Sequence, residues 1–229
     1  MDILFEDDFI LVCKKPAGVA TQAAKISEKD MVSEVNNYLY KRAGHTCPAF
    51  LIHRLDKPVA GILVFAKTKD MAAKLNGQLS LGKMSKKYYC VVNGICSGEN
   101  ILLTDYLTKD SKQSKAVIST EKAKDAKKAE LIYSVVPYKK ITESDFLKDF
   151  IPDNFDNSTY SLLDIKLLTG RFHQIRAQLS GAGFPILGDV KYGGEEIATK
   201  NKIFLIAYEL SFVHPKSGKN MTFSLEMTK

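Results

Sequence analysis

Two stretches of this sequence alternate strictly between apolar and polar residues. In residues 163–167, leucine and isoleucine alternate with aspartate and lysine, and residues 221–227 follow the same pattern. A period of two residues is typical of strands that bury one face and expose the other, as in an antiparallel sheet. Because short strands outnumber helices and the helices are not regularly interleaved with them, we predict an α+β fold rather than a doubly wound sheet.

Further helices and strands are predicted from periodicity and from end signals. Ser27 and Asp30 resemble a capping box at the start of a helix over residues 27–43, and Gly44 is a typical residue to end it. The other predicted elements are strands over residues 3–5, 9–14, 62–67 and 87–92, a helix over residues 69–81, and a helix that begins near Arg171 or Phe172.

Composition sets the class of protein. Of 229 residues, 45% are hydrophobic and 26% charged, which is ordinary for a globular protein with a sizeable core. No repeat, low-complexity tract or Pro-rich linker divides the chain, so residues 1–229 are predicted to form a single domain. No apolar run approaches the roughly 18 residues of a membrane helix. The chain starts with MDILFEDD, acidic where a secretory signal is basic, which predicts a cytoplasmic protein with no membrane partner.

Motifs for metals and cofactors are missing from the sequence. The four cysteines, at positions 13, 47, 90 and 96, form no C-x-x-C pair, and we interpret them as reduced thiols rather than a disulfide frame or a zinc site. No phosphate loop, dinucleotide fingerprint or His/Cys cluster is present either. We therefore expect neither a cofactor nor a metal.

The charge balance favours an anionic partner without proving one. Lys and Arg number 33 against 26 Asp and Glu, a net charge of +7, and the sequence pI is about 9.0. Such values fit nucleic-acid binding, but many proteins are mildly basic for no specific reason. Residues 109–128 contain seven lysines among a few acids. This segment is either the solvated surface of a hairpin or a contact to phosphates.

Three stretches contain residue types suited to chemistry. In the first, His53-Arg54-Leu55-Asp56 is followed by Gly61 and precedes a predicted buried strand. Taken alone, an arginine two residues before an aspartate is typical of an exposed ion pair. In the second, Tyr88 opens a predicted strand, where a tyrosine packs in the core more often than it acts in catalysis.

The third stretch, residues 167–183, combines a predicted strand, a turn and a helix. We predict that Phe172, Ile175 and Leu179 form the buried stripe of this helix. The other surface would then present four polar side chains: His173, Gln174, Arg176 and Gln178. A helix N-terminus that follows a strand is suited to binding phosphate or carboxylate, although the polar face could also be merely solvated.

Together these stretches resemble the RluA-type pseudouridine synthases, which isomerise uridine in RNA. The resemblance covers nearly the whole chain. It rests on the opening ILFEDDFILVCKKPAGVATQ and on four ordered motifs: HRLD-x-x-x-x-G, K-x-Y, L-x-T-G-R-x-H-Q-I-R, and GD-x-x-YGG at residues 188–194. It implies a mixed, mainly antiparallel sheet with flanking helices around a central cleft. It also implies an RNA partner (rRNA or tRNA), here without the N-terminal accessory RNA-binding domain of some relatives. Our default expectation for the oligomeric state is a monomer.

The resemblance also implies roles for individual residues. Asp56 matches the catalytic aspartate and Arg171 the arginine that pairs with it. Tyr88 matches the tyrosine whose ring packs against the target base, and Arg54 the arginine that enters the space left by the flipped nucleotide. The remaining predicted substrate-binding residues are His53, His173, Gln174 and Arg176. One departure is that Val59-Ala60 stand where the family usually has Thr-Ser.

Pseudouridine formation breaks the N1–C1′ bond of uridine and rejoins the base through C5. This chemistry needs one ionised carboxylate, as nucleophile or as base, and the sequence leaves both roles open for Asp56. We expect Arg171 to keep Asp56 charged, because a cation within about 4–6 Å lowers an Asp pKa by roughly 1–3. Two other functions stay open: an RNA-binding module without activity, and a sugar-cleaving hydrolase that pairs Asp56 with Asp189.

Overall fold

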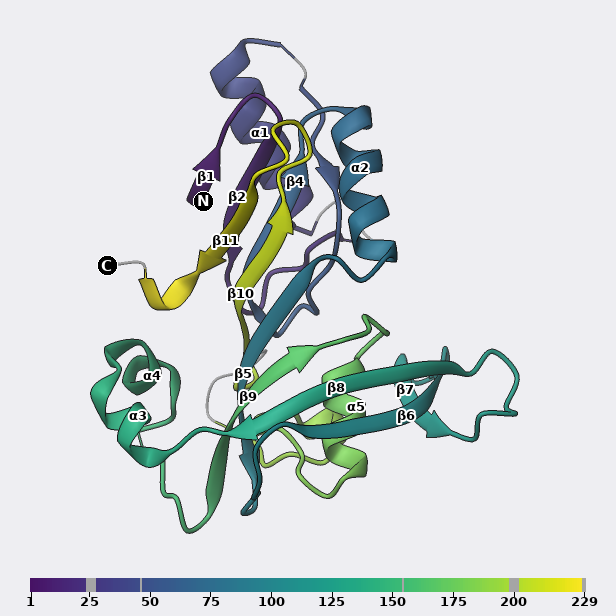
Figure 1. Cartoon of the computed structure of the whole chain (residues 1–229), viewed down its shortest axis with the longest axis vertical. Helices are drawn as coiled ribbons and strands as arrows, with labels where there is room; N and C mark the ends of the chain where they lie inside the picture. The colour runs from purple at the N-terminus through teal and green to yellow at the C-terminus, as the bar shows by residue number, and fades with distance from the viewer. Residues whose placement is uncertain (24–27, 46, 154, 198–201, 228–229) are drawn as a thin grey trace. The chain divides into compact units, whose positions relative to one another are not determined.

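The computed structural model describes residues 1–23, 28–45, 47–153, 155–197 and 202–227. The chain divides into two compact units, which are shown together in Figure 1. Unit 1 contains Met1–Lys86 and Ala207–Lys229, and unit 2 contains Lys87–Ile206. Strands β5 (Ser85–Asn93) and β10 (Leu205–Val213) run through the two boundaries. The C-terminal residues therefore fold with the N-terminal ones.

Unit 1 is built on an antiparallel sheet in which β4 is central. The order of its strands is β1, β2, β4, β10, with β3 paired to β4 and β11 to β10. Every residue of β4 after the first is buried, because the strand is covered on both faces, which explains its continuous apolar run. The elements are β1 (Asp2–Glu6), β2 (Ile10–Lys15), α1 (Met31–Ala43), β3 (Phe50–Leu51), β4 (Ala60–Ala66), α2 (Lys69–Ser80), β11 (Asn220–Ser224) and the 3-10 helix η2 (Leu225–Met227).

Helix α1 begins later than the sequence predicts. Its N-cap is Asp30, whose carboxylate accepts a hydrogen bond from the backbone N–H of Ser33 at 2.7 Å. The predicted capping residue, Ser27, lies outside the described residues. Gly44 ends the helix with a φ of 72°, as predicted. At the C-terminus, the predicted strand over residues 221–227 is shorter, because the chain turns into η2 after Ser224.

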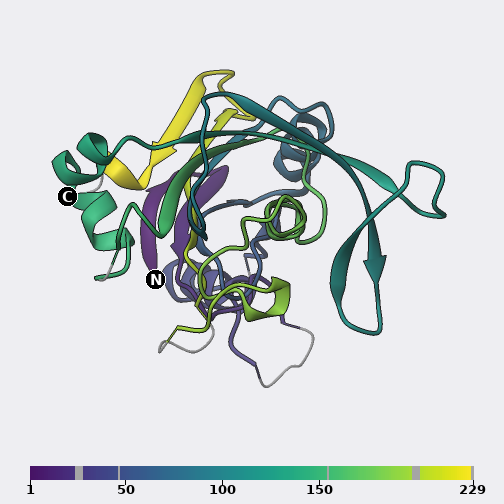
Figure 2. The same ribbon diagram turned by 90° about the horizontal axis from the view of Figure 1, so that it is seen from below.

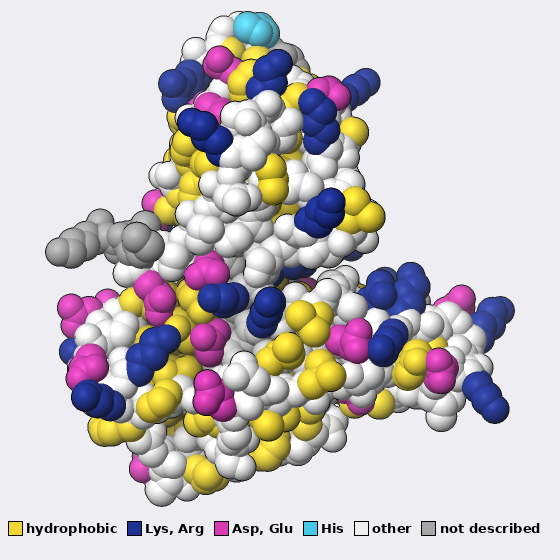
Figure 3. Space-filling model, in the orientation of Figure 1, with side chains coloured by type: hydrophobic (Ala, Val, Ile, Leu, Met, Phe, Trp, Pro, Cys, Tyr) yellow, Lys and Arg dark blue, Asp and Glu magenta, His cyan; other side chains and the backbone are white. Residues whose placement is uncertain are grey.

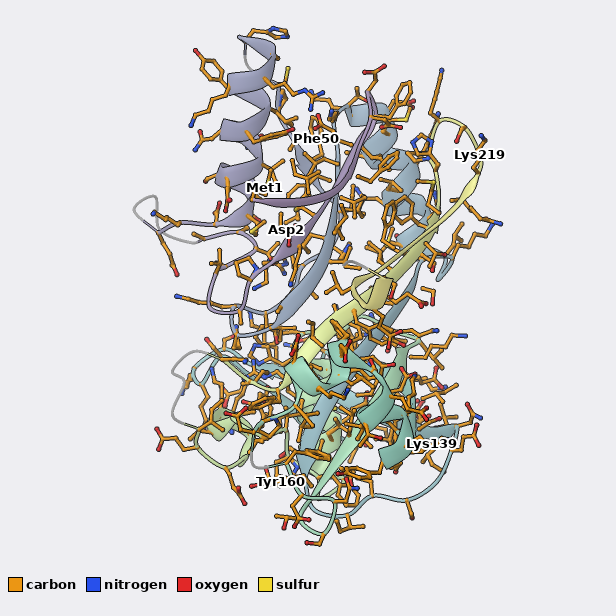
Figure 4. The ribbon with its side chains drawn as sticks, turned by 90° about the vertical axis from the view of Figure 1, so that its left-hand side faces the viewer. Met1, Asp2, Phe50, Lys139, Tyr160 and Lys219 are labelled. Carbon is orange, nitrogen blue, oxygen red and sulfur yellow. The ribbon has the colours of Figure 1, made fainter. Side chains whose placement is uncertain are left out.

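Unit 2 contains a second run of antiparallel strands with a projecting hairpin. Its strands follow the order β5, β9, β8, β6, β7, and Figure 2 shows the β6–β7 hairpin reaching out from the other strands. Figure 4 labels Tyr160 at the start of β9 and Lys139 on α3. The elements are β6 (Ile101–Asp110), β7 (Lys115–Ser119), β8 (Lys127–Val135), α3 (Tyr138–Glu143), α4 (Asp145–Phe150), β9 (Tyr160–Leu167), α5 (Gln174–Gly181) and the 3-10 helix η1 (Val190–Tyr192).

The fold class predicted from the sequence is confirmed. Both units combine antiparallel strands with few helices, which is an α+β architecture. Within the described part of the chain, no helix is long and apolar enough to cross a membrane.

Candidate active site

Asp56 lies in a loop of unit 1 between β3 and β4, and residues 53–59 are called the Asp56 loop here. Leu55 and Val59 are buried in the core at 6% and 2% exposure, and Asp56 between them is only partly covered. Arg54 is exposed. The two apolar side chains anchor the loop on either side of the carboxylate, which leaves Asp56 and Arg54 at the surface of this unit.

The segment after β2 holds the backbone of the Asp56 loop. The Thr21 hydroxyl donates a hydrogen bond to the Leu55 carbonyl at 2.7 Å and accepts one from the Leu55 N–H at 3.1 Å. The Gly18 N–H donates to the Lys57 carbonyl at 2.8 Å. The loop is thus hydrogen-bonded on both sides of Asp56, although Val59-Ala60 have no hydroxyl to offer.

Lys15 is a residue of this site that sequence reasoning missed. Its side chain is fully buried, and its ammonium donates to the carbonyls of Pro16, Val19 and Lys57 at 3.0, 2.6 and 3.1 Å. Burial lowers the pKa of Lys15 to about 8, while the negative charge of Asp56 acts in the opposite direction. The available signal was a lysine at an inward position of the apolar strand ILVCKK, directly before Pro16.

The structure at Gly61 explains why the HRLD-x-x-x-x-G motif ends in glycine. Its φ is 141°, and a Cβ placed on it would lie 2.5 Å from both the Cβ and the carbonyl oxygen of Ala207. Any side chain at this position would push β4 away from β10, so the strand that follows the Asp56 loop requires glycine here.

His53, at the start of the Asp56 loop, is an uncharged buried imidazole. It is 7% exposed, and among the described residues neither ring nitrogen has a hydrogen-bond partner. Burial, together with the nearby Lys86 ammonium, lowers the pKa of His53 to about 3. An imidazole with unsatisfied nitrogens is suited to receive a polar group, and its predicted contact with substrate stays a prediction.

Tyr88 and Arg171 both lie in unit 2. Tyr88 is buried in β5 at 6% exposure. Arg171 is exposed, its Nε donates to the Lys128 carbonyl at 2.8 Å, and its backbone N–H donates to Gln174 Oε1 at 2.9 Å. The backbone of β8 therefore orients the guanidinium. The pairing of Arg171 with Asp56 and the packing of Tyr88 on a base stay predictions.

The start of α5 differs from the prediction. The helix begins at Gln174, not at Arg171 or Phe172, because His173 has a φ of 50°, in the left-handed region. Residues 169–171 lie before the helix, and there the Thr169 hydroxyl and the Arg171 N–H donate hydrogen bonds to the Gln174 side chain. Phe172 thus lies outside the helix at 39% exposure, and its predicted place in the buried stripe is wrong.

The predicted polar surface of α5 is also wrong. Three of its members are buried, Gln174 at 3%, Arg176 at 5% and Gln178 at 1% exposure. Gln174 bonds to Gln178 and to the Glu130 carbonyl, so both amides connect α5 to β8. A helical period cannot distinguish a polar face in water from one packed on strand backbone. In the structure Gln174 and Arg176 support the fold, and their predicted binding of substrate stays untested.

Four residues, called the α5 network here, connect the helix to the GD-x-x-YGG motif. Arg176 forms a bidentate ion pair with Asp189, with both N···O distances 2.7 Å, and Asp189 is 1% exposed. Arg176 Nη1 also lies 3.1 Å from His173 Nε2, and His173 Nδ1 lies 2.9 Å from the Tyr192 hydroxyl. Both carboxylate oxygens of Asp189 are engaged, which makes it unsuitable as the second carboxylate of a hydrolase.

The sequence matches known proteins along most of its length. A family model described as RNA pseudouridylate synthase matches residues 9–181. The chain is 27% identical to tRNA pseudouridine synthase C of Vibrio parahaemolyticus, over 96% of this chain and 88% of that protein. It is 30% identical to ribosomal large subunit pseudouridine synthase D of Zymomonas mobilis, over 99% of this chain and 69% of that protein.

Solved structures show the same fold. Human RNA Pseudouridylate Synthase Domain Containing 4 matches with a TM-score of 0.74 at 20% identity, over 100% of this chain and 89% of that one. The chain belongs to the RNA pseudouridylate synthase family. It is an RNA pseudouridine synthase, and therefore an isomerase.

Proposed function

We propose that this enzyme converts a uridine of tRNA or rRNA to pseudouridine, and that Asp56 is its catalytic carboxylate. In this reaction the N1–C1′ bond breaks and a C5–C1′ bond forms, while C5 loses a proton and N1 gains one, so that atoms and electrons balance. Asp56 acts on the sugar or the base as nucleophile or as general base. Names of similar proteins include both tRNA and ribosomal RNA enzymes, which supports either substrate.

The observation that carries this proposal is the way unit 1 holds Asp56. Its carboxylate is partly exposed on a loop whose neighbours are pinned by backbone hydrogen bonds, with a buried ammonium group nearby. A positive charge nearby favours the ionised form of a carboxylate. This is the form that the isomerisation needs.

The other residues receive the roles that the resemblance implies. Arg54 is exposed next to Asp56 and can enter the stack when the target uridine is extruded, an extrusion that costs a few kcal/mol. Tyr88 presents an aromatic ring to the extruded base, and Arg171 contributes a second positive charge to Asp56. In this proposal residues 1–229 act as one catalytic domain and as a monomer.

The test compares Asp56→Asn with Asp70→Asn, a control that removes an exposed carboxylate of α2 in the same unit. Each variant is incubated with tRNA and, separately, with rRNA from cells that lack this gene, and pseudouridines are mapped. Asp56→Asn should lose activity on the order of 10³-fold or more, while Asp70→Asn keeps it. The RNA fraction modified by the unaltered enzyme identifies the substrate.

Three results would contradict the proposal. Near-normal activity of Asp56→Asn would exclude Asp56 as the catalytic group. Free uracil in place of pseudouridine would indicate a hydrolase. RNA binding without any product from either fraction would indicate a binding module.

A further inference from the structure

An exposed phenylalanine precedes α5 in unit 2. Phe172 is 39% exposed, and its ring stacks on that of His173 with centroids 3.8 Å apart and an interplanar angle of 19°. One face of the ring therefore lies against a flat, nearly parallel neighbour. Large aromatic side chains are normally buried on folding, so a partly exposed ring on a supporting one needs an explanation.

The supporting imidazole has one fixed protonation state. A guanidinium can only donate, so His173 Nε2 accepts from Arg176 Nη1. A neutral imidazole has a single N–H, which must then lie on Nδ1 and donate to the Tyr192 hydroxyl. Burial and the Arg176 guanidinium lower the pKa of His173 to about 3. The ring under Phe172 is therefore neutral at physiological pH and held by hydrogen bonds at both nitrogens.

The rest of the α5 network makes this support rigid. Asp189 fixes the guanidinium of Arg176 by two hydrogen bonds. The Tyr192 hydroxyl accepts a hydrogen bond from the Ala116 N–H of β7 at 2.7 Å, and its ring packs among the apolar side chains of the hairpin and α5. The orientation of the His173 ring that supports Phe172 is thus set before any ligand arrives, which reduces the entropy that binding would cost.

The other face of Phe172 is next to an exposed cation. Lys109 is exposed at the end of β6, and its ammonium lies 5.0 Å from the Phe172 centroid. Because His173 covers one face, this ammonium lies over the opposite one. Figure 3 shows basic side chains, with acidic ones between them, at the hairpin end of unit 2. Lys191 is also exposed, and its positive charge acts on His173.

We propose that Phe172, supported by His173, is a stacking platform for an unpaired base of the RNA substrate, and that Lys109 then binds a phosphate of the same strand. This proposal rests on the proposed function, because it assumes that the ligand is RNA. When a base stacks, the ammonium of Lys109 leaves the ring and moves to the phosphate of that nucleotide or its neighbour. No covalent step is involved.

A base that stacks on Phe172 binds more strongly than the Lys109 ammonium that it displaces from the ring. Stacking of a base on an aromatic side chain contributes roughly 5- to 150-fold to affinity. An exposed cation–π contact contributes only about 2- to 5-fold. Lys109 moreover gains a phosphate partner in place of the ring. The lysines of the hairpin then contact phosphates of the RNA strand that continues beyond the platform. This proposal therefore favours a phosphate contact for residues 109–128 over a purely solvated surface.

The competing explanation is that Phe172 and Lys109 only connect the hairpin to α5. Three substitutions distinguish the two: Phe172→Tyr keeps a flat ring, Phe172→Leu keeps apolar volume without one, and Tyr138→Leu removes an exposed ring elsewhere in unit 2, on α3. The probe is a short single-stranded RNA of mixed sequence that carries 2-aminopurine. Its dissociation constant and fluorescence are measured with each full-length variant, together with the melting temperature of the protein.

If Phe172 is a stacking platform, Phe172→Leu weakens binding of the oligonucleotide by about 5-fold or more. It also removes the fluorescence quenching that stacking causes. Phe172→Tyr and Tyr138→Leu keep both the affinity and the quenching of the unaltered protein. The melting temperature of each variant stays within a few degrees of the unaltered one. Equal affinity of the leucine and tyrosine variants at position 172 would overturn the platform. A large drop in melting temperature for Phe172→Leu with unchanged affinity would show the connecting role instead.

Lys109→Gln tests the phosphate contact. It should reduce the slope of log affinity against log salt by about one charge, whereas Lys139→Gln, a matched exposed lysine on α3 (Figure 4), should not. An unchanged slope for Lys109→Gln would remove this lysine from the proposal. If the unaltered enzyme binds the probe through Phe172 but forms no pseudouridine, the proposed function fails and the platform stands. If it forms pseudouridine while Phe172→Leu binds normally, the platform alone fails.

Discussion

In unit 1 the Asp56 loop is held mainly through its backbone, whereas in unit 2 the start of α5 is held mainly through side chains. Around Asp56, the partners are the ammonium of Lys15, the hydroxyl of Thr21 and the N–H of Gly18, all within one short segment of the chain. Around Phe172, the partners are His173, Arg176, Asp189 and Tyr192, which come from two motifs.

The two kinds of hydrogen bonding fix different parts of the molecule. Backbone hydrogen bonds fix a loop's path and leave the Asp56 and Arg54 side chains to the substrate. A side-chain network instead fixes the orientation of another side chain, such as the ring of His173. The first arrangement suits a catalytic carboxylate, and the second suits a surface that must be flat and rigid before it binds.

The largest expected effect on the free energy of unfolding comes from a substitution in unit 2. Asp189→Asn leaves the buried guanidinium of Arg176 without its negative partner, and loss of one member of a buried pair costs about 3–5 kcal/mol. We expect a corresponding fall in the free energy of unfolding, measured in denaturant. The double variant Asp189→Asn with Arg176→Met should recover part of it, since no uncompensated charge stays buried. A single variant as stable as the unaltered protein would show that the network does not hold α5.

In unit 1 the corresponding change is Lys15→Met. It leaves the carbonyls of Pro16, Val19 and Lys57 without this donor, but it also removes a buried charge, so the net loss should be smaller, about 2–4 kcal/mol. The adjacent Lys14→Met is the control, because Lys14 is only partly buried. Equal unfolding free energies for the two variants would contradict the role of Lys15. Loss of pseudouridine formation in a folded Lys15→Met protein would show that backbone support is needed for catalysis.

The same difference explains what could be predicted from the sequence. In unit 1 the end of α1 and the position of β4 follow from local signals, namely Gly44 and the apolar run, and the motif around Asp56 lies in consecutive residues. Lys15 was missed because a lysine is expected at the surface, and only its place in the fold shows three carbonyls around it.

At α5, local signals gave the wrong answer. The spacing of Phe172, Ile175 and Leu179 fits a buried stripe, yet the left-handed backbone of His173 moves Phe172 out of the helix. In this conformation the His173 side chain bonds to Arg176 and to Tyr192 of a separate motif, and a helical period contains neither contact. Sequence patterns are therefore reliable here where the partners are local in the chain, and unreliable where side chains from separate motifs decide the backbone.

The smallest expected effect concerns pH and compares one histidine in each unit. His53 and His173 both have a folded-state pKa of about 3, against 6.5 for an ordinary histidine. Below pH 6.5 the unfolded chain binds protons that the folded protein does not, so stability is complete above pH 6.5 and falls as the pH drops towards 3. For the buried His53 the loss is about 2 kcal/mol at pH 5.

Unfolding free energies at pH 7 and pH 5 measure this loss. His53→Phe should reduce the pH dependence, because an apolar ring of similar shape takes no proton, whereas His45→Gln, at an exposed turn, should leave it unchanged. Part of the dependence should persist in His53→Phe, since His173 still resists protonation beside Arg176. A pH dependence that disappears entirely in His53→Phe would mean that His173 accepts its proton freely, and that the support beneath Phe172 is looser than its hydrogen bonds indicate.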